Sequence, residues 1–410
     1  MIPIETESSF ELSSGTADAA ISGAATTQVQ ISAVIPCLNE QETIGLCIEK
    51  ALKSFDTLGV RGEVVVADNG STDQSVAVAQ LSGAKVVHER RKGYGAALLR
   101  GIRESNGEII VMADADDSYD WLDIGRLIDK IREGYDLVMG NRFQGGIQRG
   151  AMPPLHRYLG NPVLSLVARV AFRTRIGDFH CGMRAFTRTA FEQMQLQTTG
   201  MEFATEMIAN AVHQRLKIAE VPVVLYPDKR NRPPHLRSFR DGWRHLRFIL
   251  TYAPDYMFVV PGMAMFLTGV GLDACLVRGP IVIHGLYFGI HFLALGALLT
   301  LAGFNILNLG VLAKTLMTQR YGRLKSRTVA FLRRRFSLEA GLLSGVALML
   351  LGGSVDAWLM ERWLTHYGAP MNSTIHLAFV VTTGMILGLN LIFTSFLLNL
   401  ILADHSNENR

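Results

Sequence analysis

The chain has 410 residues, a length that allows about two to three domains. Hydrophobic residues make up 49% of it, charged residues only 19%, and the mean hydropathy is +0.22, which excludes a protein lying wholly in water. A net charge of +4 does not favour nucleic-acid binding, and the four cysteines lack metal or disulfide spacing and indicate reduced thiols.

Residues 1–30 are rich in Ser, Thr, Ala and Glu and lack the basic start and apolar core of a signal peptide. We expect this N-terminus to be disordered. From residue 31 onward, apolar segments alternate with helical ones. We predict strands at 31–35, 63–67, 84–87 and 109–113, and helices at 42–58, 74–81 and 96–104. This alternation predicts right-handed crossovers and a mostly parallel sheet.

An acidic cluster, Asp114-Ala115-Asp116-Asp117, follows directly on the predicted strand 109–113. Two carboxylates spaced i, i+2 leave the end of a strand on the same side. Mg²⁺ and Mn²⁺ prefer such oxygen ligands, with substrate phosphates filling the remaining positions. An isolated pair of this kind is equally compatible with a solvated acidic turn, so its neighbours decide the interpretation.

Three polar turns follow the other predicted strands, at 36–40, 68–73 and 90–95. Parallel α/β sheets bind ligands outside the carboxyl ends of their strands, so these turns should meet the acidic cluster in one crevice. That arrangement suits a nucleotide bound through a metal ion.

These motifs resemble those of family 2 glycosyltransferases with the GT-A fold, over residues 31 to about 250. Within that family the chain is most similar to the polyprenyl-phosphate sugar synthases of the dolichol-phosphate mannose synthase type. The resemblance implies an α/β, Rossmann-like GT-A catalytic domain over 31–235, followed by an α-helical transmembrane domain.

The resemblance also implies roles for individual residues. The nucleotide-sugar would be bound by Pro36, Asn39, Glu40, Asp68, Lys92, Asp114, Ala115 and Asp116. A Mg²⁺ or Mn²⁺ ion would be held by Asp114, Asp116 and Ser118, the last standing where relatives commonly have Gln. The acceptor phosphate would face Arg142, Arg149, Arg230 and Arg237. Asp116, Arg142 and Arg237 are the expected catalytic residues.

Two segments have the character of interfacial helices. Residues 236–255 interleave arginines with Phe239, Trp243 and Phe248, which suits the headgroup region next to a membrane span. The second candidate, 156–173, is predicted to place Leu159, Val163, Leu166, Val167 and Val170 on one face. An ordinary core-packing helix is an equally good interpretation of this second segment.

Four apolar stretches within 256–402 are long enough to span a bilayer. They lie at 256–276, 281–301 (extending to 316 if the helix continues), 338–359 and 375–400. The loop 314–335 carries eight Lys and Arg residues, whereas the other two loops carry one each. This asymmetry predicts a multi-pass protein of the plasma (cytoplasmic) membrane, with the basic loop, the catalytic domain and the tail 403–410 in the cytoplasm.

A lipid phosphate acceptor is already anionic near neutral pH and needs no strong general base. Asp117 and Asp178 are the candidates for a base if the acceptor were a hydroxyl group. Glu202 and Glu206, spaced i, i+4, form either a solvated or arginine-paired helix face or part of the acceptor pocket.

The sequence therefore predicts inverting transfer of one sugar from a nucleotide-sugar to a polyprenyl or dolichyl phosphate on the cytoplasmic membrane face. The donor stays open between a UDP-hexose, a UDP-N-acetylhexosamine and GDP-mannose. Related enzymes assemble through their membrane helices, so a homo-oligomer is one further expectation. The alternatives are a processive polysaccharide synthase, whose Gln-x-x-Arg-Trp motif is absent from the sequence, and a non-catalytic membrane scaffold.

Overall fold

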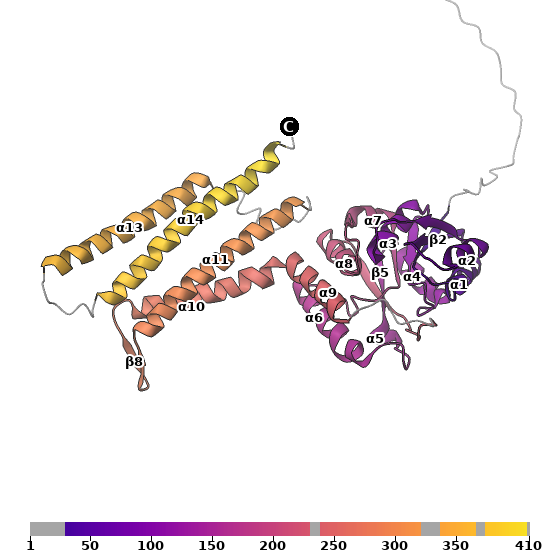
Figure 1. Ribbon diagram of the computed structural model, residues 1–410, viewed down its shortest axis with the longest axis horizontal. Coiled ribbons are helices and arrows are strands. Elements are labelled where there is room, and N and C mark those ends of the chain that lie inside the picture. The colour runs from indigo at the N-terminus through magenta and orange to yellow at the C-terminus, as the bar shows by residue number, and fades with distance from the viewer. Residues whose placement is uncertain (1–28, 230–237, 321–336, 366–373, 408–410) are drawn as a thin grey trace, which may run out of the picture.

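A computed structural model describes residues 29–229, 238–320, 337–365 and 374–407. These residues form an α/β domain and a separate set of long helices, joined by helix α9 (Ser238–Tyr252) (Figure 1). Most of the N-terminal segment for which we expect disorder lies outside the described residues.

The α/β domain is built on a seven-stranded sheet with strand order β3-β2-β1-β4-β6-β5-β7. The strands are β1 (Ile31–Cys37), β2 (Gly62–Asp68), β3 (Lys85–His88), β4 (Ile109–Met112), β5 (Leu137–Asn141), β6 (Arg184–Thr187) and β7 (Ile218–Pro222). Only β6 runs antiparallel to its neighbours, β4 and β5. The mostly parallel sheet is thereby confirmed.

Helices cover both faces of the sheet, as its continuous apolar strands require. Val34 and Val65 point into one core, whereas Ile35 and Val66 point into the other. The first core is closed by α3 (Tyr94–Glu104), α6 (Asn161–Phe172), α7 (Arg188–Met194), α8 (Phe203–His213) and α9. The second is closed by α1 (Ile44–Leu58), α2 (Ser75–Leu81) and α4 (Gly125–Arg132). A short helix, α5 (Arg142–Gly145), follows β5.

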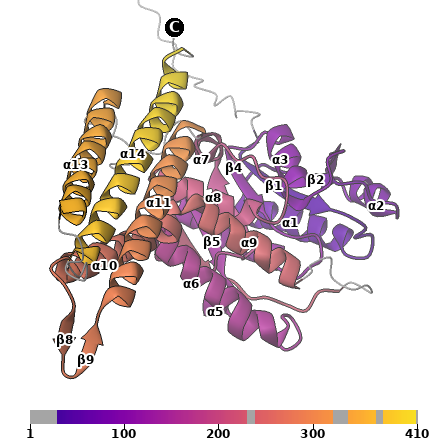
Figure 2. The ribbon, with the colours of Figure 1, turned by 60° about the vertical axis from the view of Figure 1, so that its left-hand side comes forward.

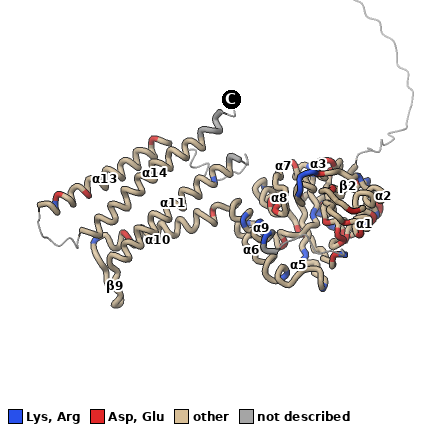
Figure 3. The backbone as a smooth tube through the Cα atoms, viewed as in Figure 1, with Lys and Arg blue, Asp and Glu red and all other residues tan. Residues whose placement is uncertain are grey.

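Four helices of the described chain are long and apolar enough to cross a membrane: Asp255–Leu276, Ile290–Thr318, Leu338–Thr365 and Ile375–Leu402. They belong to α10 (Val260–Leu276), α11 (Ile290–Arg320), α13 (Leu338–Thr365) and α14 (Ile375–Asn407). Helix α10 packs on α11, α11 on α14 and α14 on α13, so the helices form a row (Figures 1 and 2). They carry few charged side chains, in contrast to the α/β domain (Figure 3).

The second span differs from the sequence prediction, which placed its start at Ile281. Residues 281–288 instead form a hairpin of β8 (Ile281–Ile283) and β9 (Leu286–Phe288), and the helix begins only at Ile290. The physical reason is local. The β-branched run favours a strand, and His284 and Gly285 both adopt positive φ, the conformation of a tight hairpin turn.

Glycines allow the first two membrane helices to approach closely. A Cβ atom on Gly303 of α11 would clash with the backbone of Phe266 in α10, and one on Gly269 would clash with Thr300. The Thr300 hydroxyl also donates a hydrogen bond to Asp273 Oδ2, at 3.1 Å. Close packing and an interhelical hydrogen bond are the forces that hold helices together in lipid, where apolar burial contributes little.

We therefore expect Gly303→Leu to lower the thermal stability of the detergent-solubilised protein, by an amount corresponding to about 1–3 kcal/mol for an overpacked site. Gly271→Leu is the matched control, because a Cβ atom there meets no other atom within 4 Å. Melting curves of both variants provide the measurement. Equal melting temperatures would contradict the packing described here.

Candidate active site

The polar turns after β1 and β2 are tied together by side chains of both. Asn39 adopts a left-handed conformation with φ of 58°, and its Oδ1 accepts a hydrogen bond from the Thr72 N–H at 2.7 Å. The N–H of Glu40, a buried residue, donates to Ser75 Oγ at 2.7 Å. The predicted nucleotide residues Pro36, Asn39 and Glu40 therefore lie beside the turn that carries Asp68.

Asp68 is buried at the carboxyl end of β2 and is held as a carboxylate. Burial alone would raise its pKa, but hydrogen bonds from Ser71, His88 and the Gly70 N–H outweigh burial and lower the pKa. The next residue, Asn69, bonds through its side chain to the backbone of Glu89, Arg91 and Gly93. Its own carbonyl accepts from Lys92 Nζ at 2.8 Å. Asn69 thus brings the third predicted turn, with Lys92, to the same crevice.

The acidic cluster follows β4 at the same edge of the sheet. Asp114 Oδ1 accepts a hydrogen bond from the Tyr94 hydroxyl at 2.9 Å, and its Oδ2 packs so closely on Gly182 that a side chain there would clash with it. Asp116 is 6% exposed, and its Oδ1 accepts from the Ser118 N–H at 3.0 Å. Ala115, between them, is buried. Both carboxylates are therefore held in defined orientations.

Asp117 has a structural role. It adopts a positive φ of 57°, and its carboxylate pairs with Lys50 Nζ at 2.7 Å and with Lys229 Nζ at 2.6 Å. Two lysines from distant parts of the chain neutralise this buried group. A carboxylate paired in this way is poorly suited to act as a general base, so the first of the two candidate bases is disfavoured.

The second candidate, Asp178, forms a buried ion pair with Arg142. The Arg142 guanidinium donates from Nε to Oδ2 at 2.6 Å and from Nη2 to Oδ1 at 2.8 Å, and the Arg142 N–H donates to Oδ2 at 3.2 Å. Burial would raise the pKa of Asp178, but the charge and hydrogen bonds of Arg142 lower it. Among the described residues, Arg142 Nη1 makes no hydrogen bond, so its N–H groups can donate to an oxygen atom of a ligand.

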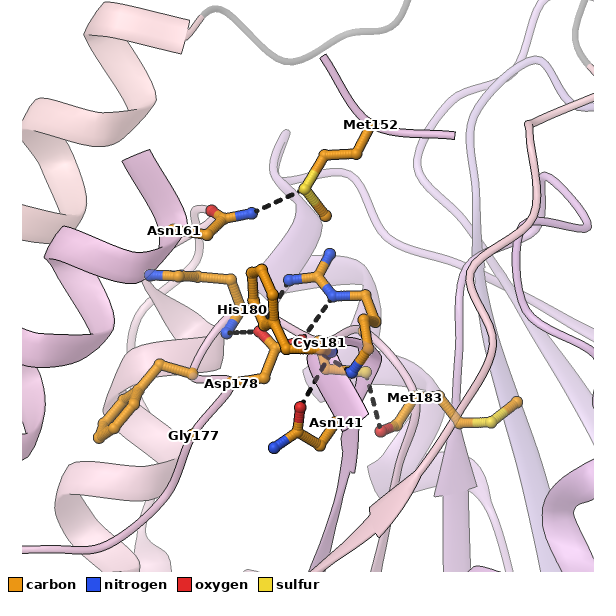
Figure 4. Close-up of polar contacts among 12 residues, drawn as sticks. Asn141, Met152, Asn161, Gly177, Asp178, His180, Cys181 and Met183 are labelled. Atoms are coloured by element: carbon orange, nitrogen blue, oxygen red, sulfur yellow. Dashed lines mark hydrogen bonds and ion pairs between the residues drawn. The ribbon is translucent and has the colours of Figure 1, made fainter. Parts of the chain in front are cut away.

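Asp178 begins a loop that is fixed along its whole length (Figure 4). Arg184 is fully buried and donates to the carbonyls of Phe179, Cys181 and Ala204. On the other side of the loop, Glu220 accepts from the backbone N–H groups of Gly177 and Asp178. The ion pair therefore stands on a rigid support.

The two glutamates at the start of α8 have different environments. Glu206 is fully buried and accepts hydrogen bonds from the N–H groups of Gln197 and Thr198 and from the Thr198 hydroxyl. Burial raises its pKa. It is neither solvated nor paired with arginine, and it fastens the loop before α8. Glu202 Oε2 is buried without a hydrogen-bond partner among the described residues.

The donor set of this edge fits a hard divalent cation that shares its ligands with a substrate. Within the described residues no three His, Cys, Asp or Glu side chains converge as a closed metal site. Mg²⁺ is commonly bound by one or two carboxylates plus substrate phosphates, and Asp114 with Asp116 supplies that number.

Of the four predicted acceptor arginines, Arg142 alone is described here in the ion pair with Asp178. Arg149 is exposed in the loop after α5, and Arg230 and Arg237 lie outside the described residues. Conversely, sequence reasoning gave no role to Tyr94 or Lys50 and did not connect Lys229 with Asp117. Tyr94 lies between two glycines at the start of α3, a local signal that was available in the sequence. The lysines were not identifiable, because only the fold brings them to Asp117.

The comparisons with known proteins agree with this geometry. Residues 32–195 match the model described as "Glycosyl transferase family 2", and residues 311–402 match "Glycosyltransferase family 2 C-terminal transmembrane region". The low-salt glycan biosynthesis hexosyltransferase Agl6 of Haloferax volcanii is 38% identical over 369 residues, covering 90% of this chain and 88% of that protein. The chain belongs to glycosyltransferase family 2.

Further relatives of this family 2 glycosyltransferase are named for lipid-linked sugars. The dolichyl-phosphate hexose transferase of Haloferax volcanii is 29% identical, over 47% of this chain and 81% of that protein. The undecaprenyl-phosphate 4-deoxy-4-formamido-L-arabinose transferase of Salmonella paratyphi B is 27% identical, over 47% and 59%. Among solved structures, glucosyl-3-phosphoglycerate synthase from Mycobacterium tuberculosis with Mn²⁺ and UDP is 25% identical over 55% of this chain and 78% of that chain, with a TM-score of 0.42.

The family 2 glycosyltransferase thus has a GT-A catalytic domain followed by a membrane domain of four apolar helices, as the sequence predicted. It is an enzyme of the membrane.

Removing the carboxylate of the buried ion pair tests its importance. We expect Asp178→Asn to destabilise the protein by about 3–5 kcal/mol, because the Arg142 charge would stay buried without a partner. Asp129→Asn, at a carboxylate whose side chain is 66% exposed, is the control. Thermal unfolding in detergent provides the measurement, and similar melting temperatures for the two variants would refute the expectation.

The same pair has a defined pH dependence. Because the folded protein lowers the pKa of Asp178, its contribution is fully present above the unfolded value of about 3.9 and is lost as the pH falls through the folded value. The stability difference between wild type and Asp178→Asn should therefore stay constant from about pH 6 to 8.

Proposed function

We propose that this enzyme transfers a single sugar from a nucleotide-sugar to a polyprenyl or dolichyl phosphate, with inversion at the anomeric carbon. Pro36, Asn39, Glu40, Asp68 and Lys92 would bind the nucleotide. Their support is the hydrogen-bonded joining of the three turns that follow β1, β2 and β3.

Asp114 and Asp116, with Ser118 in the same turn, would hold a Mg²⁺ or Mn²⁺ ion on the donor diphosphate. When bound, such an ion neutralises the charge that develops on the departing nucleoside diphosphate. The Tyr94 hydroxyl and the Ser118 N–H orient the two carboxylates for this role.

The acceptor supplies its own nucleophile. A phosphate monoester carries nearly two negative charges at neutral pH. Its oxygen attacks the anomeric carbon, while the bond from that carbon to the nucleoside diphosphate oxygen breaks, so no proton has to be removed. The pairing of Asp117 with two lysines and of Asp178 with Arg142 supports this chemistry, since both candidate bases are neutralised. Arg142 would donate to the acceptor phosphate from Nη1, with Arg149, Arg230 and Arg237 as its further contacts.

One observation carries the lipid acceptor: α6 presents an apolar face that nothing in the described chain covers. Ser165, Ala168 and Phe172 are buried against the α/β domain. The opposite face exposes Val163, Leu166 and Val170, together with Leu159 from the turn His156–Gly160 just before α6, each between 46% and 57% exposed. Val167, predicted on the same face, instead packs against the core. This pattern favours the interfacial over the core-packing interpretation of this segment. The helix packs on α9, and the Arg173 side chain at its end interacts with that of Tyr256 at the start of the first span.

The face of α6 would therefore lie on the same membrane that α10 enters. Arg240, Arg244 and Arg247 of α9 suit lipid phosphates at that surface (Figure 3). The excess of Lys and Arg in loop 314–335 supports a cytoplasmic position for the catalytic domain.

A transfer assay tests the proposal. Membranes containing the full chain would receive polyprenyl phosphate, Mn²⁺ or Mg²⁺, and radiolabelled UDP-glucose, UDP-N-acetylglucosamine or GDP-mannose. We expect one donor to give an acid-labile labelled lipid. We expect Asp116→Asn to reduce its formation by on the order of 10²-fold or more, because charge stabilisation at the leaving group is lost. Asp129→Asn should retain wild-type activity. A polymer instead of a labelled lipid, or equal activity of both variants, would refute the proposal.

A second variant tests the membrane contact of α6. Leu159→Glu combined with Leu166→Glu should lower transfer to polyprenyl phosphate roughly tenfold or more, since burying each leucine is worth about 1.5–3 kcal/mol. Leu81→Glu is the control, because Leu81 is 89% exposed on α2 at another part of the domain. Donor binding, measured separately, should be unchanged in both. Equal transfer rates would argue against a membrane role for this face.

A further inference from the structure

Helix α9 connects the membrane to the catalytic domain and also contacts the loop that holds Arg142. At its C-terminal end, Phe248 and Ile249 are buried in the core formed with α6 and α8. His245 lies one turn earlier on the same side and is 8% exposed. Its Nδ1 is 3.0 Å from the hydroxyl of Thr205, a fully buried residue of α8. This hydrogen bond fixes the imidazole in one orientation.

The ring of His245 rests on a second imidazole, that of His180. The ring centroids are 4.6 Å apart and the planes meet at 71°, an edge-to-face contact. His180 Nε2 is buried without a hydrogen-bond partner in the described chain. Burial, followed by the neighbouring His245, lowers the pKa of His180 well below its usual value, so the ring is neutral near pH 7.

His180 belongs to the loop whose first residue pairs with Arg142. Its backbone N–H donates to Asp178 Oδ1 at 3.2 Å, and that same oxygen accepts from Arg142 Nη2 (Figure 4). A continuous series of contacts thus runs from α9 through His245, His180 and Asp178 to the guanidinium. Glu220 holds the same loop from the side of β7, so α9 and β7 support it from two directions.

We propose that His245 is a positioning residue, which sets the orientation of Arg142 toward the acceptor phosphate through His180 and Asp178. This inference rests on the proposed function, because it assumes that Arg142 faces that phosphate. The arrangement couples the position of α9 at the membrane to Arg142, which follows β5 at the carboxyl edge of the sheet. The lipid phosphate and its arginine are then positioned by the same helix.

The alternative is that His245 only packs in the core and does not position Arg142. Enzyme kinetics distinguishes these two roles. In the transfer assay with the full chain in membranes, His245→Ala should raise the KM for polyprenyl phosphate and lower the kcat/KM for that acceptor about tenfold. The KM for the nucleotide-sugar should stay unchanged. His245→Gln keeps a hydrogen-bonding group for Thr205 and should recover most of the loss. His213→Ala is the matched control: His213 is a second imidazole on the neighbouring helix α8, its ring packs edge-on to Phe172, and among the described residues it makes no hydrogen bond or ring contact with His180 or Asp178.

A double-mutant cycle gives a readout that does not depend on activity. The melting-temperature shifts of His245→Ala and Asp178→Asn should be non-additive, whereas those of His213→Ala and Asp178→Asn should add. Additive shifts for the first pair, or equal changes of both KM values in His245→Ala, would overturn the inference. Absence of any lipid product with wild-type enzyme, with a non-additive cycle, would overturn the proposed function and leave the physical link between α9 and Arg142 standing.

Discussion

The buried ion pair between Arg142 and Asp178 is the interaction on which the site depends. An arginine 7% exposed and an aspartate fully enclosed by protein are tolerated only together, since either charge alone would lose several kcal/mol of hydration without compensation. The protein surrounds the pair with fixed groups: Glu220 on one side, the carbonyls bound by Arg184 beneath, and His180 toward α9. These contacts hold the Arg142 guanidinium in one position and restrict its motion.

The distribution of charge in the crevice follows a consistent rule. Two carboxylates are neutralised within the protein, Asp117 by Lys50 and Lys229 and Asp178 by Arg142. Asp114 and Asp116, in contrast, accept hydrogen bonds from the Tyr94 hydroxyl and from the Ser118 backbone N–H, which orient the two carboxylates. In the proposed function, Asp114 and Asp116 would face the cation and Arg142 would face the acceptor phosphate.

The parts of the site that are encoded by neighbouring residues could be predicted from the sequence. The acidic cluster after 109–113 is recognisable because a strand and the turn after it are contiguous in the chain. The convergence of the three polar turns follows from parallel topology alone. The partners of Asp117 could not be predicted, because Lys50 and Lys229 are 67 and 112 residues away. Glu206 was misjudged for a related reason: its spacing from Glu202 describes one helix, whereas its partners lie in the loop before that helix.

In the membrane region, the sequence located the apolar segments but did not determine the secondary structure of each one. Hydropathy located four spans, but it could not distinguish the hairpin at 281–288 from the start of a helix, since both are apolar. The outer edges of a two-stranded hairpin leave backbone N–H and C=O groups unpaired, and lipid hydrocarbon offers them no partner. We therefore infer that this hairpin lies at the membrane surface opposite α9. Helix α10 therefore has a catalytic domain at one end and a short polar-backbone element at the other. Its depth in the bilayer would be limited from both sides, which would hold the site next to α9 at the level of lipid headgroups.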